Sequence, residues 1–304
     1  MKSMALVWAV MFIFNALSSF THIAGKEAVM HVSPWAVGFY RFVMGAVTMW
    51  LLMRAAGRTI VLEASDRWRF LTLAVLAVPL NQLSFLVGIH HTPASHPALL
   101  YATTPAWVLL FALALGIERL RWWKWTGVAL ALIGVVILLG GEVTTVHRQV
   151  AGGDVILLLA VLSWSLYTAL GKPVVERYGA LETTFVVMVF GALLYFPFGL
   201  YLAWTADYSG ADTSVWLGIV YMGVITSGVA YFLWYWMLQR IRPSQVAVVT
   251  CAQPPTTAFL AWLAFGTAPT GNLLLSGAMI LAGIVLMVGY GGPKRSMPAS
   301  IKAE

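Results

Sequence analysis

The side chains best suited to binding a small molecule are polar and aromatic residues inside otherwise apolar segments. Asn15, Ser19 and His22 fall at helical spacing on one face of the first segment, and Trp164 and Tyr167 share a face of the sixth. Amides and hydroxyls hold ammonium and carboxylate groups, while aromatic rings stack on apolar or cationic side chains. These residues therefore predict a pocket for a small amphipathic solute.

The same argument extends to polar and aromatic residues at mid-depth in the other segments, rather than at the ends, where Trp and Tyr form interfacial belts. The predicted substrate-binding residues are Asn15, His22, Arg41, Asn81, Tyr101, Trp107, Trp164, Tyr167, Tyr231, Trp234 and Gln253.

Arg41 is the one formal charge that lies well inside a predicted segment. It falls about 10 Å along the helix from Pro34, which places it below the surface but short of the midplane. A charge there is costly unless it is paired or wetted, so it should face the bundle interior. Two roles are open: the guanidinium holds a substrate carboxylate, or it caps broken-helix carbonyls and snorkels outward.

Four residues are predicted to bend or weaken helices. A proline inside a helix lacks an N–H and clashes with the carbonyl four residues back. Pro105 and Pro254 lie at matching places in the fourth and ninth segments, and Pro79 in the third matches Gly228 in the eighth. We expect these four positions to act as kinks or hinges beside the pocket, although a static packing kink would leave the same pattern.

Acidic residues occur only at segment ends or in connections. Exchange of protons for a cationic substrate usually needs a carboxylate within the membrane. Transport without proton coupling is therefore expected, with His22 as the main titratable group left inside. No phosphate-binding loop, metal-ligand spacing or nucleophile elbow is present, so we expect no enzyme activity, no metal and no cofactor.

The composition is that of an integral membrane protein. The chain is 61% hydrophobic and 10% charged, with a mean hydropathy of +0.85. A membrane-spanning helix needs about 20 apolar residues. Ten such spans are predicted: Met4–Ala24, Pro34–Met53, Trp68–His90, Pro97–Leu115, Trp125–Gly140, Asp154–Gly171, Thr183–Ala203, Thr213–Leu238, Ser244–Phe265 and Gly271–Gly291.

Lys and Arg alternate between the connections, as the positive-inside rule requires. With a cytoplasmic N-terminus, only Lys26 and Arg148 lie outside, whereas the other cations apart from Arg41 lie inside. A multi-pass protein of the inner or plasma membrane with both ends in the cytoplasm is therefore predicted. The net charge of +7 is explained by this topology, so no nucleic-acid partner is expected. The expected partners are a small-molecule substrate and the lipid bilayer, and the oligomeric state stays open.

Sparse matches between the two halves of the chain predict a duplication. Gly25–Lys26 recurs as Gly171–Lys172, and Gly45 recurs as Gly191 at the same offset. Five spans per half is an odd number, so the second copy must be inverted, as in many secondary transporters. The expected domains are residues 1–150 and 151–292, each a five-helix repeat, followed by a cytoplasmic tail at 293–304.

The chain resembles the EamA family of the drug/metabolite transporter superfamily. The resemblance rests on Arg41 within "AVGFYRFVMGAV" and on the small-residue stretch "HTPASHPALLYATTP" that leads to Pro105. The second half departs from the pattern, because Val187 stands where Arg41 would be. The resemblance implies an all-α integral membrane fold of ten helices in two inverted repeats. Since the family keeps this arginine across different substrates, it favours a structural role for Arg41.

The function that these observations favour is export of amino acids, including aromatic and other hydrophobic ones, or of similar metabolites by alternating access. The resemblance is strongest to the amino-acid-exporting branch of the superfamily. Two alternatives remain. A broad-specificity drug or metabolite exporter would share the architecture, whereas a non-transporting membrane scaffold would not need matched mid-helix prolines in inverted repeats.

Overall fold

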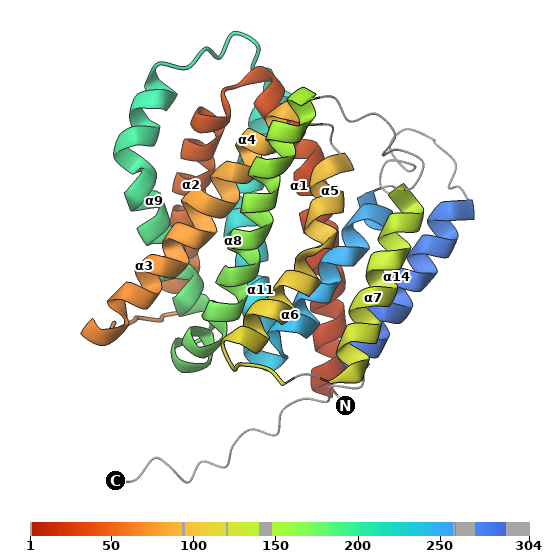
Figure 1. Ribbon diagram of the computed structural model, residues 1–304. Helices are drawn as coiled ribbons and strands as arrows, with labels where there is room; N and C mark the ends of the chain where they lie inside the picture. Colours follow the sequence, from red (N-terminus) through yellow and green to blue (C-terminus); the bar gives the residue numbers. More distant parts are fainter. Residues whose placement is uncertain are drawn as a thin grey trace, which may run out of the picture.

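Every regular element of the protein is helical in the computed structural model, which describes residues 2–92, 95–119, 121–139, 148–257, 259 and 271–289. The helices run side by side as one bundle (Figure 1). α9 (Ala180–Trp204) lies at one edge, and α7 (Trp122–Leu139) pairs with α14 (Gly271–Gly289) at the other. The domain boundary predicted near residue 150 falls beside undescribed residues, and the predicted tail at 293–304 lies outside the described residues.

Within the described part of the chain, six helical stretches are long and apolar enough to cross a membrane: Met4–His31, Pro34–Ala55, Ala64–His91, Gly152–Tyr178, Ala180–Trp204 and Thr213–Arg240. Large apolar side chains stand exposed on the outer faces of these stretches, among them Phe12 at 76% and Trp204 at 87%. Such continuous apolar surface is unfavourable in water and suits a lipid environment. The protein is therefore a multi-pass membrane protein.

The first, second and sixth spans form uninterrupted helices: α1 (Lys2–His31), α2 (Pro34–Ala55) and α8 (Arg148–Tyr178). α1 and α8 extend beyond the spans predicted for them, Met4–Ala24 and Asp154–Gly171. The predicted spans end at these residues because polar residues follow. Those polar residues find partners inside the protein. The amine of Lys26, for example, donates to the carbonyl oxygens of Ile89 and Thr92, each at 2.9 Å.

Two other stretches change helix type in their middle. The short 3₁₀ turn η1 (Ala64–Asp66) leads into α3 (Arg67–Val75), which continues through the π-helical segment η2 (Leu76–Leu83) into α4 (Ser84–His91). Pro79 lies inside η2. π-Helical turns are rare and often occur at functional sites.

The second of these stretches has the same order of helix types. α10 (Thr213–Val220) continues through the π-helical η3 (Tyr221–Ala230) into α11 (Tyr231–Arg240), and Gly228 lies inside η3. The predicted weak points at Pro79 and Gly228 thus both coincide with departures from α-helical geometry.

Two further spans depart from continuous α-helix near a proline. α5 (Ser95–Ala102) stops at Thr103, and α6 (Thr104–Ala114) begins with Pro105 in its first turn. α12 (Pro243–Ala247) passes into the 3₁₀ segment η4 (Val248–Ala252), and helix resumes over residues 253–257 around Pro254. The predicted ninth span ends at Phe265, and of its residues after 257 the structure describes only residue 259.

Glycines allow three pairs of elements to approach closely. A Cβ added at Gly283 of α14 would lie 2.7 Å from the carbonyl oxygen of Gly127 in α7. A Cβ at Gly45 of α2 would lie 2.9 Å from the Ser227 side chain in η3, and one at Gly191 of α9 would meet Val78 of η2. Gly127 and Gly283 thus allow α7 and α14 to pack closely, whereas a Cβ added at Gly277 of α14 would meet no atom of the described residues within 4 Å.

Candidate substrate cavity

A small cavity of about 60 Å³ lies between the first and second halves of the chain. The elements around it are α1, α2, η2, α4, α5, α8, η3, α11 and η4, which includes both π-helical segments. The lining residues are Phe14, Ser18, Thr21, His22, Arg41, Asn81, Gln82, Phe85, Tyr101, Trp164, Thr226, Ala230, Tyr231, Thr250 and Gln253. Such a space holds several water molecules.

Arg41 supplies a buried positive charge to this cavity. Its side chain is 3% exposed, and its Nε donates to the hydroxyl oxygen of Ser227 at 2.9 Å. Ser227 in turn donates to Gln82 Oε1 at 2.6 Å, so its oxygen is free to accept from Arg41. The NH1 group of Arg41 has no hydrogen-bond partner within the described part of the chain. Among the described residues, the lining contains no carboxylate.

His22 contacts the ninth predicted span. Its Nε2 lies 3.1 Å from Gln253 Oε1, and its Nδ1 is buried with no hydrogen-bond partner among the residues that the structure describes. The ring lies against those of Phe85 and Tyr101, with centroids 5.7 and 6.1 Å away. The cavity therefore carries a second polar nitrogen whose bonding capacity is unused.

Asn81 joins three elements beside the cavity. Its Nδ2 donates to the hydroxyl of Tyr101 and to the carbonyl oxygen of Ala160, both at 2.8 Å. Its Oδ1 accepts from the hydroxyl of Tyr231 at 2.9 Å. The amide of Asn81 is thus largely satisfied by the protein and fixes α5, α8 and α11 around the cavity.

Aromatic rings form the wall on the α8 side. Trp164 contacts Tyr231 at a centroid distance of 4.9 Å, Trp234 at 4.8 Å and Tyr167 at 5.3 Å. Tyr167 is itself stacked on Tyr235. Only Trp164 and Tyr231 of this group reach the cavity, and the other rings support them from behind.

The cavity brings together most of the predicted binding residues but leaves four outside its lining. Asn15 donates to Thr256 Oγ1 at 2.6 Å, and Trp234 donates to Thr168 Oγ1 at 3.0 Å. Tyr167 packs in the aromatic layer behind Trp164, and Trp107 of α6 is half-buried away from the cavity. The predicted residues that do line it are His22, Arg41, Asn81, Tyr101, Trp164, Tyr231 and Gln253.

Several lining residues were missed by the sequence argument, including Ser18, Thr21, Gln82 and Thr226. Gln82 follows Asn81 directly, and adjacent residues of a regular α-helix point about 100° apart. The wider π-helical turn of η2 lets both amides reach the cavity. Two adjacent amides in an apolar span could have indicated from the sequence that both residues line the cavity. The change of helix type could not be predicted from the sequence.

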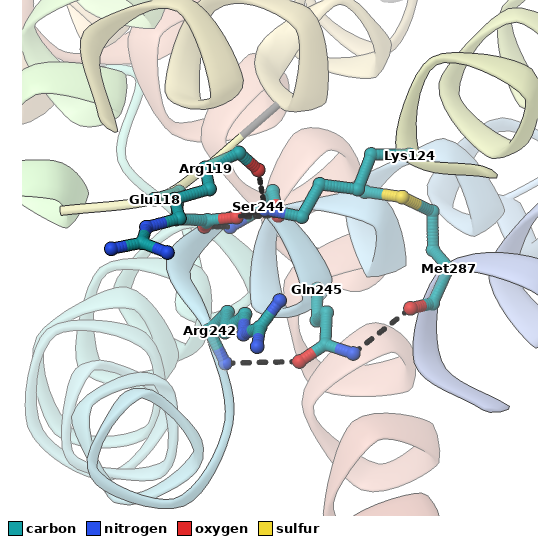
Figure 2. Close-up of polar contacts among 7 residues, drawn as sticks. All are labelled: Glu118, Arg119, Lys124, Arg242, Ser244, Gln245 and Met287. Carbon is teal, nitrogen blue, oxygen red and sulfur yellow. Dashed lines mark hydrogen bonds and ion pairs between the residues drawn. The ribbon is translucent and has the colours of Figure 1, made fainter. Parts of the chain in front are cut away.

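A second buried polar cluster, outside the cavity lining, joins the α6–α7 connection to the start of α12 (Figure 2). Glu118 accepts from the backbone N–H of Ser244 at 2.8 Å and from its hydroxyl at 2.7 Å. Glu118 also pairs with Lys124, and both side chains are 1% exposed. Gln245 Nε2 extends the contacts to the Met287 carbonyl oxygen of α14 at 2.9 Å.

The predicted spans leave Glu118 and Lys124 in the connection at residues 116–124. Their burial could not be read from the sequence, because it depends on α12 beginning directly opposite Glu118. The cluster ties the first half of the chain to the second at one end of the bundle.

Sequence comparison finds the EamA-like transporter family at two places, residues 4–140 and 151–289. A transporter of uncharacterized function from Archaeoglobus fulgidus is 25% identical over 92% of this chain and 93% of its own length. A probable terminal-alkyne amino-acid exporter from Streptantibioticus cattleyicolor is 28% identical over 66% of each chain. One crystal structure shares the fold with a TM-score of 0.75 at 20% identity, covering 92% of this chain and 98% of the other.

Proposed function

The chain belongs to the EamA-like transporter family, and on that premise we propose that it exports amino acids or similar small metabolites. The proposed substrates include aromatic and other hydrophobic amino acids. The observation that carries the proposal is the cavity, which combines a buried arginine and several amides with a wall of aromatic rings. The similarity to an amino-acid exporter over two thirds of the chain supports the substrate class.

The proposed architecture is ten membrane spans in two inverted five-helix repeats. The two separate family matches support the duplication. Matched positions also make matched contacts: Gly45 of α2 meets η3, and Gly191 of α9 meets η2. The excess of Lys and Arg in alternate connections supports cytoplasmic ends for both termini and insertion in the cell membrane.

The proposed mechanism is alternating access, in which the two halves open the central cavity to one side at a time. The substrate gradient supplies the driving force. Absence of proton coupling is supported by the lining, which contains no carboxylate among the described residues. Glu118, the buried acid described above, pairs with Lys124 away from the cavity.

Reconstituted transport tests this proposal. Proteoliposomes loaded with a panel of labelled amino acids should release aromatic and large aliphatic ones faster than protein-free vesicles do. An imposed pH gradient should leave the rates unchanged and should not drive uphill accumulation. Release of none of the amino acids, but of unrelated lipophilic cations, would contradict the proposal and favour a broad drug exporter. Uphill accumulation driven by the pH gradient alone would contradict the uncoupled mechanism.

A further inference from the structure

Arg41 leaves a hydrogen-bond donor unused and His22 leaves an acceptor unused. Together they restrict which ligands the cavity can bind. Arg41 has an unpaired donor, because NH1 meets no acceptor in the described residues while Nε is held by Ser227. A guanidinium can only donate. At 3% exposure this cation is shielded from bulk water, so a donor that the protein leaves unpaired there is unfavourable. An anionic acceptor on the substrate would satisfy it.

His22 offers a hydrogen-bond acceptor instead of a donor. The amide oxygen of Gln253 can only accept, so the contact at 3.1 Å requires the hydrogen on Nε2 of His22. In the neutral ring Nδ1 is then an acceptor, and no described residue donates to it. A second buried cation beside Arg41, which forms no ion pair with the described residues, would be costly, and this favours the neutral ring. Nδ1 is therefore suited to a donor on the substrate.

The other amide oxygens of the lining are already engaged. Gln82 Oε1 accepts from Ser227, and Asn81 Oδ1 accepts from Tyr231. Their bonding within the protein holds the neighbouring elements in place. Among the described lining residues, NH1 of Arg41 and Nδ1 of His22 are the fully buried side-chain atoms that have no hydrogen-bond partner.

We infer that the cavity binds a zwitterion in one orientation, with its carboxylate on Arg41 and its ammonium on Nδ1 of His22. This inference rests on the proposed function and names the two anchoring residues. Gln253 is a positioning residue, because it fixes the tautomer of His22. The rings of Phe14, Phe85 and Trp164 remain available to the substrate side chain.

Three compounds test the inference on the wild-type protein alone. Phenylalanine carries both charged groups, 3-phenylpropionate lacks the ammonium, and 2-phenylethylamine lacks the carboxylate. Calorimetric titration of the purified full-length protein in nanodiscs should give the tightest binding for phenylalanine. Each analogue should bind roughly ten-fold more weakly, since a hydrogen bond to a charged group is lost.

Two variants make the test specific. Arg41→Gln should weaken phenylalanine and phenylpropionate but leave phenylethylamine unchanged. His22→Phe should weaken phenylalanine and phenylethylamine but leave phenylpropionate unchanged. Arg240→Gln is the matched control, because Arg240 is an exposed arginine that stacks on Trp236 and does not line the cavity. It should alter none of the three affinities.

The outcomes separate the inference from the proposed function. Equal binding of phenylalanine and phenylethylamine by the wild type would overturn the inference and leave amino-acid transport standing. Equal weakening of all three compounds by Arg41→Gln would assign Arg41 a structural role and overturn it as well. Wild-type protein that binds none of the three would contradict the proposed aromatic substrates themselves. If either variant fails to fold, the three compounds on the wild type still decide the question.

Discussion

Lys26 and Lys172 make the same contact in the two halves of the chain. The amine of Lys26, on α1, donates to the carbonyl oxygens of Ile89 and Thr92 at the end of α4, both at 2.9 Å. The amine of Lys172, on α8, donates to the carbonyl oxygens of Leu238 and Ile241 at the end of α11, at 2.5 and 3.0 Å. The ends of α4 and α11 lie at opposite ends of the bundle (Figure 1). Both contacts are formed at once in this structure.

The two lysines should therefore influence access in opposite directions. Lys26→Met should increase the reaction of a cysteine placed at Ser18 with a membrane-impermeant thiol reagent added outside, because the outer contact is lost. Lys172→Met should increase the same reaction from the cytoplasmic side. Labelling in inside-out and right-side-out vesicles measures both rates.

Arg67→Met, at an exposed position, serves as the control for the two lysine variants and should change neither rate. If both lysine variants increased the labelling rate from the same side, they would be loosening the bundle generally instead of opening its two opposite ends.

The predicted topology can be tested independently. Cysteines introduced at Arg58 and Arg121 should react only from the cytoplasmic side, and one at Ser209 only from outside, since the positive-inside rule places the connections that hold Arg58 and Arg121 in the cytoplasm. Impermeant maleimide labelling of intact cells gives the result. External labelling at Arg121 would contradict the ten-span arrangement.

Gly283→Ala should destabilise the α7–α14 pair. The added methyl group would meet the Gly127 backbone oxygen at 2.7 Å, and backbone cannot move aside cheaply. We expect a loss of about 1–3 kcal/mol, measured as a lower Tm in detergent. Gly277→Ala is the matched control on the same helix, because it meets nothing within 4 Å. Equal Tm values for both variants would refute the close contact.

Lys124→Met should be strongly destabilising, because it leaves the carboxylate of Glu118 buried without its cation. Removing one partner of a buried pair costs about 3–5 kcal/mol. The double variant Glu118→Gln with Lys124→Met should recover much of that loss, since glutamine still accepts from the Ser244 N–H.

Chemical and thermal unfolding of the Lys124 variants would measure these differences. Glu27→Gln, at an exposed pair with His31, is the control and should have little effect. A double variant as unstable as the single one would show that the unpaired charge is not the cause.

Trp164→Leu should reduce the transport of aromatic amino acids several-fold and spare alanine. Leucine keeps apolar bulk beside Tyr231 and Trp234 but removes the ring, and an aromatic contact is worth about 0.5–1.5 kcal/mol. Competition assays in proteoliposomes give the relative rates. Trp107→Leu is the matched control, because Trp107 does not line the cavity. Equal effects of both variants on all substrates would place the site elsewhere.

Much of the fold could be predicted from the sequence, because a helix that crosses the lipid bilayer needs about 20 apolar residues. Hydropathy located the long apolar helices, and short motifs around Arg41 and Pro105 indicated the EamA family; both predictions are confirmed at that level. The ten-span count, the inversion and the orientation stay predictions. Span ends were less predictable, because Lys26 and Lys172 extend their helices by bonding to distant carbonyls.

The cavity could be predicted in part. Polar or aromatic residues at mid-depth, such as His22 and Tyr231, were predicted as lining residues because few other roles are open to such side chains in an apolar span. Trp107 and Asn15 were included for the same reason, yet they face elsewhere, since one sequence does not fix the rotation of a helix. The π-helical turns that bring Gln82 and Thr226 to the cavity have no signature in residue type alone.

Cys251 is the single cysteine of the chain, fully buried in η4, with its thiol donating to the Ala102 carbonyl oxygen of α5 at 3.3 Å. Thiol reagents cannot reach it while η4 and α5 remain in contact. The unmodified protein therefore already provides the background needed for attaching a fluorophore or spin label at a chosen site. Reaction at the native sulfur would itself report the moment at which these two segments separate during turnover.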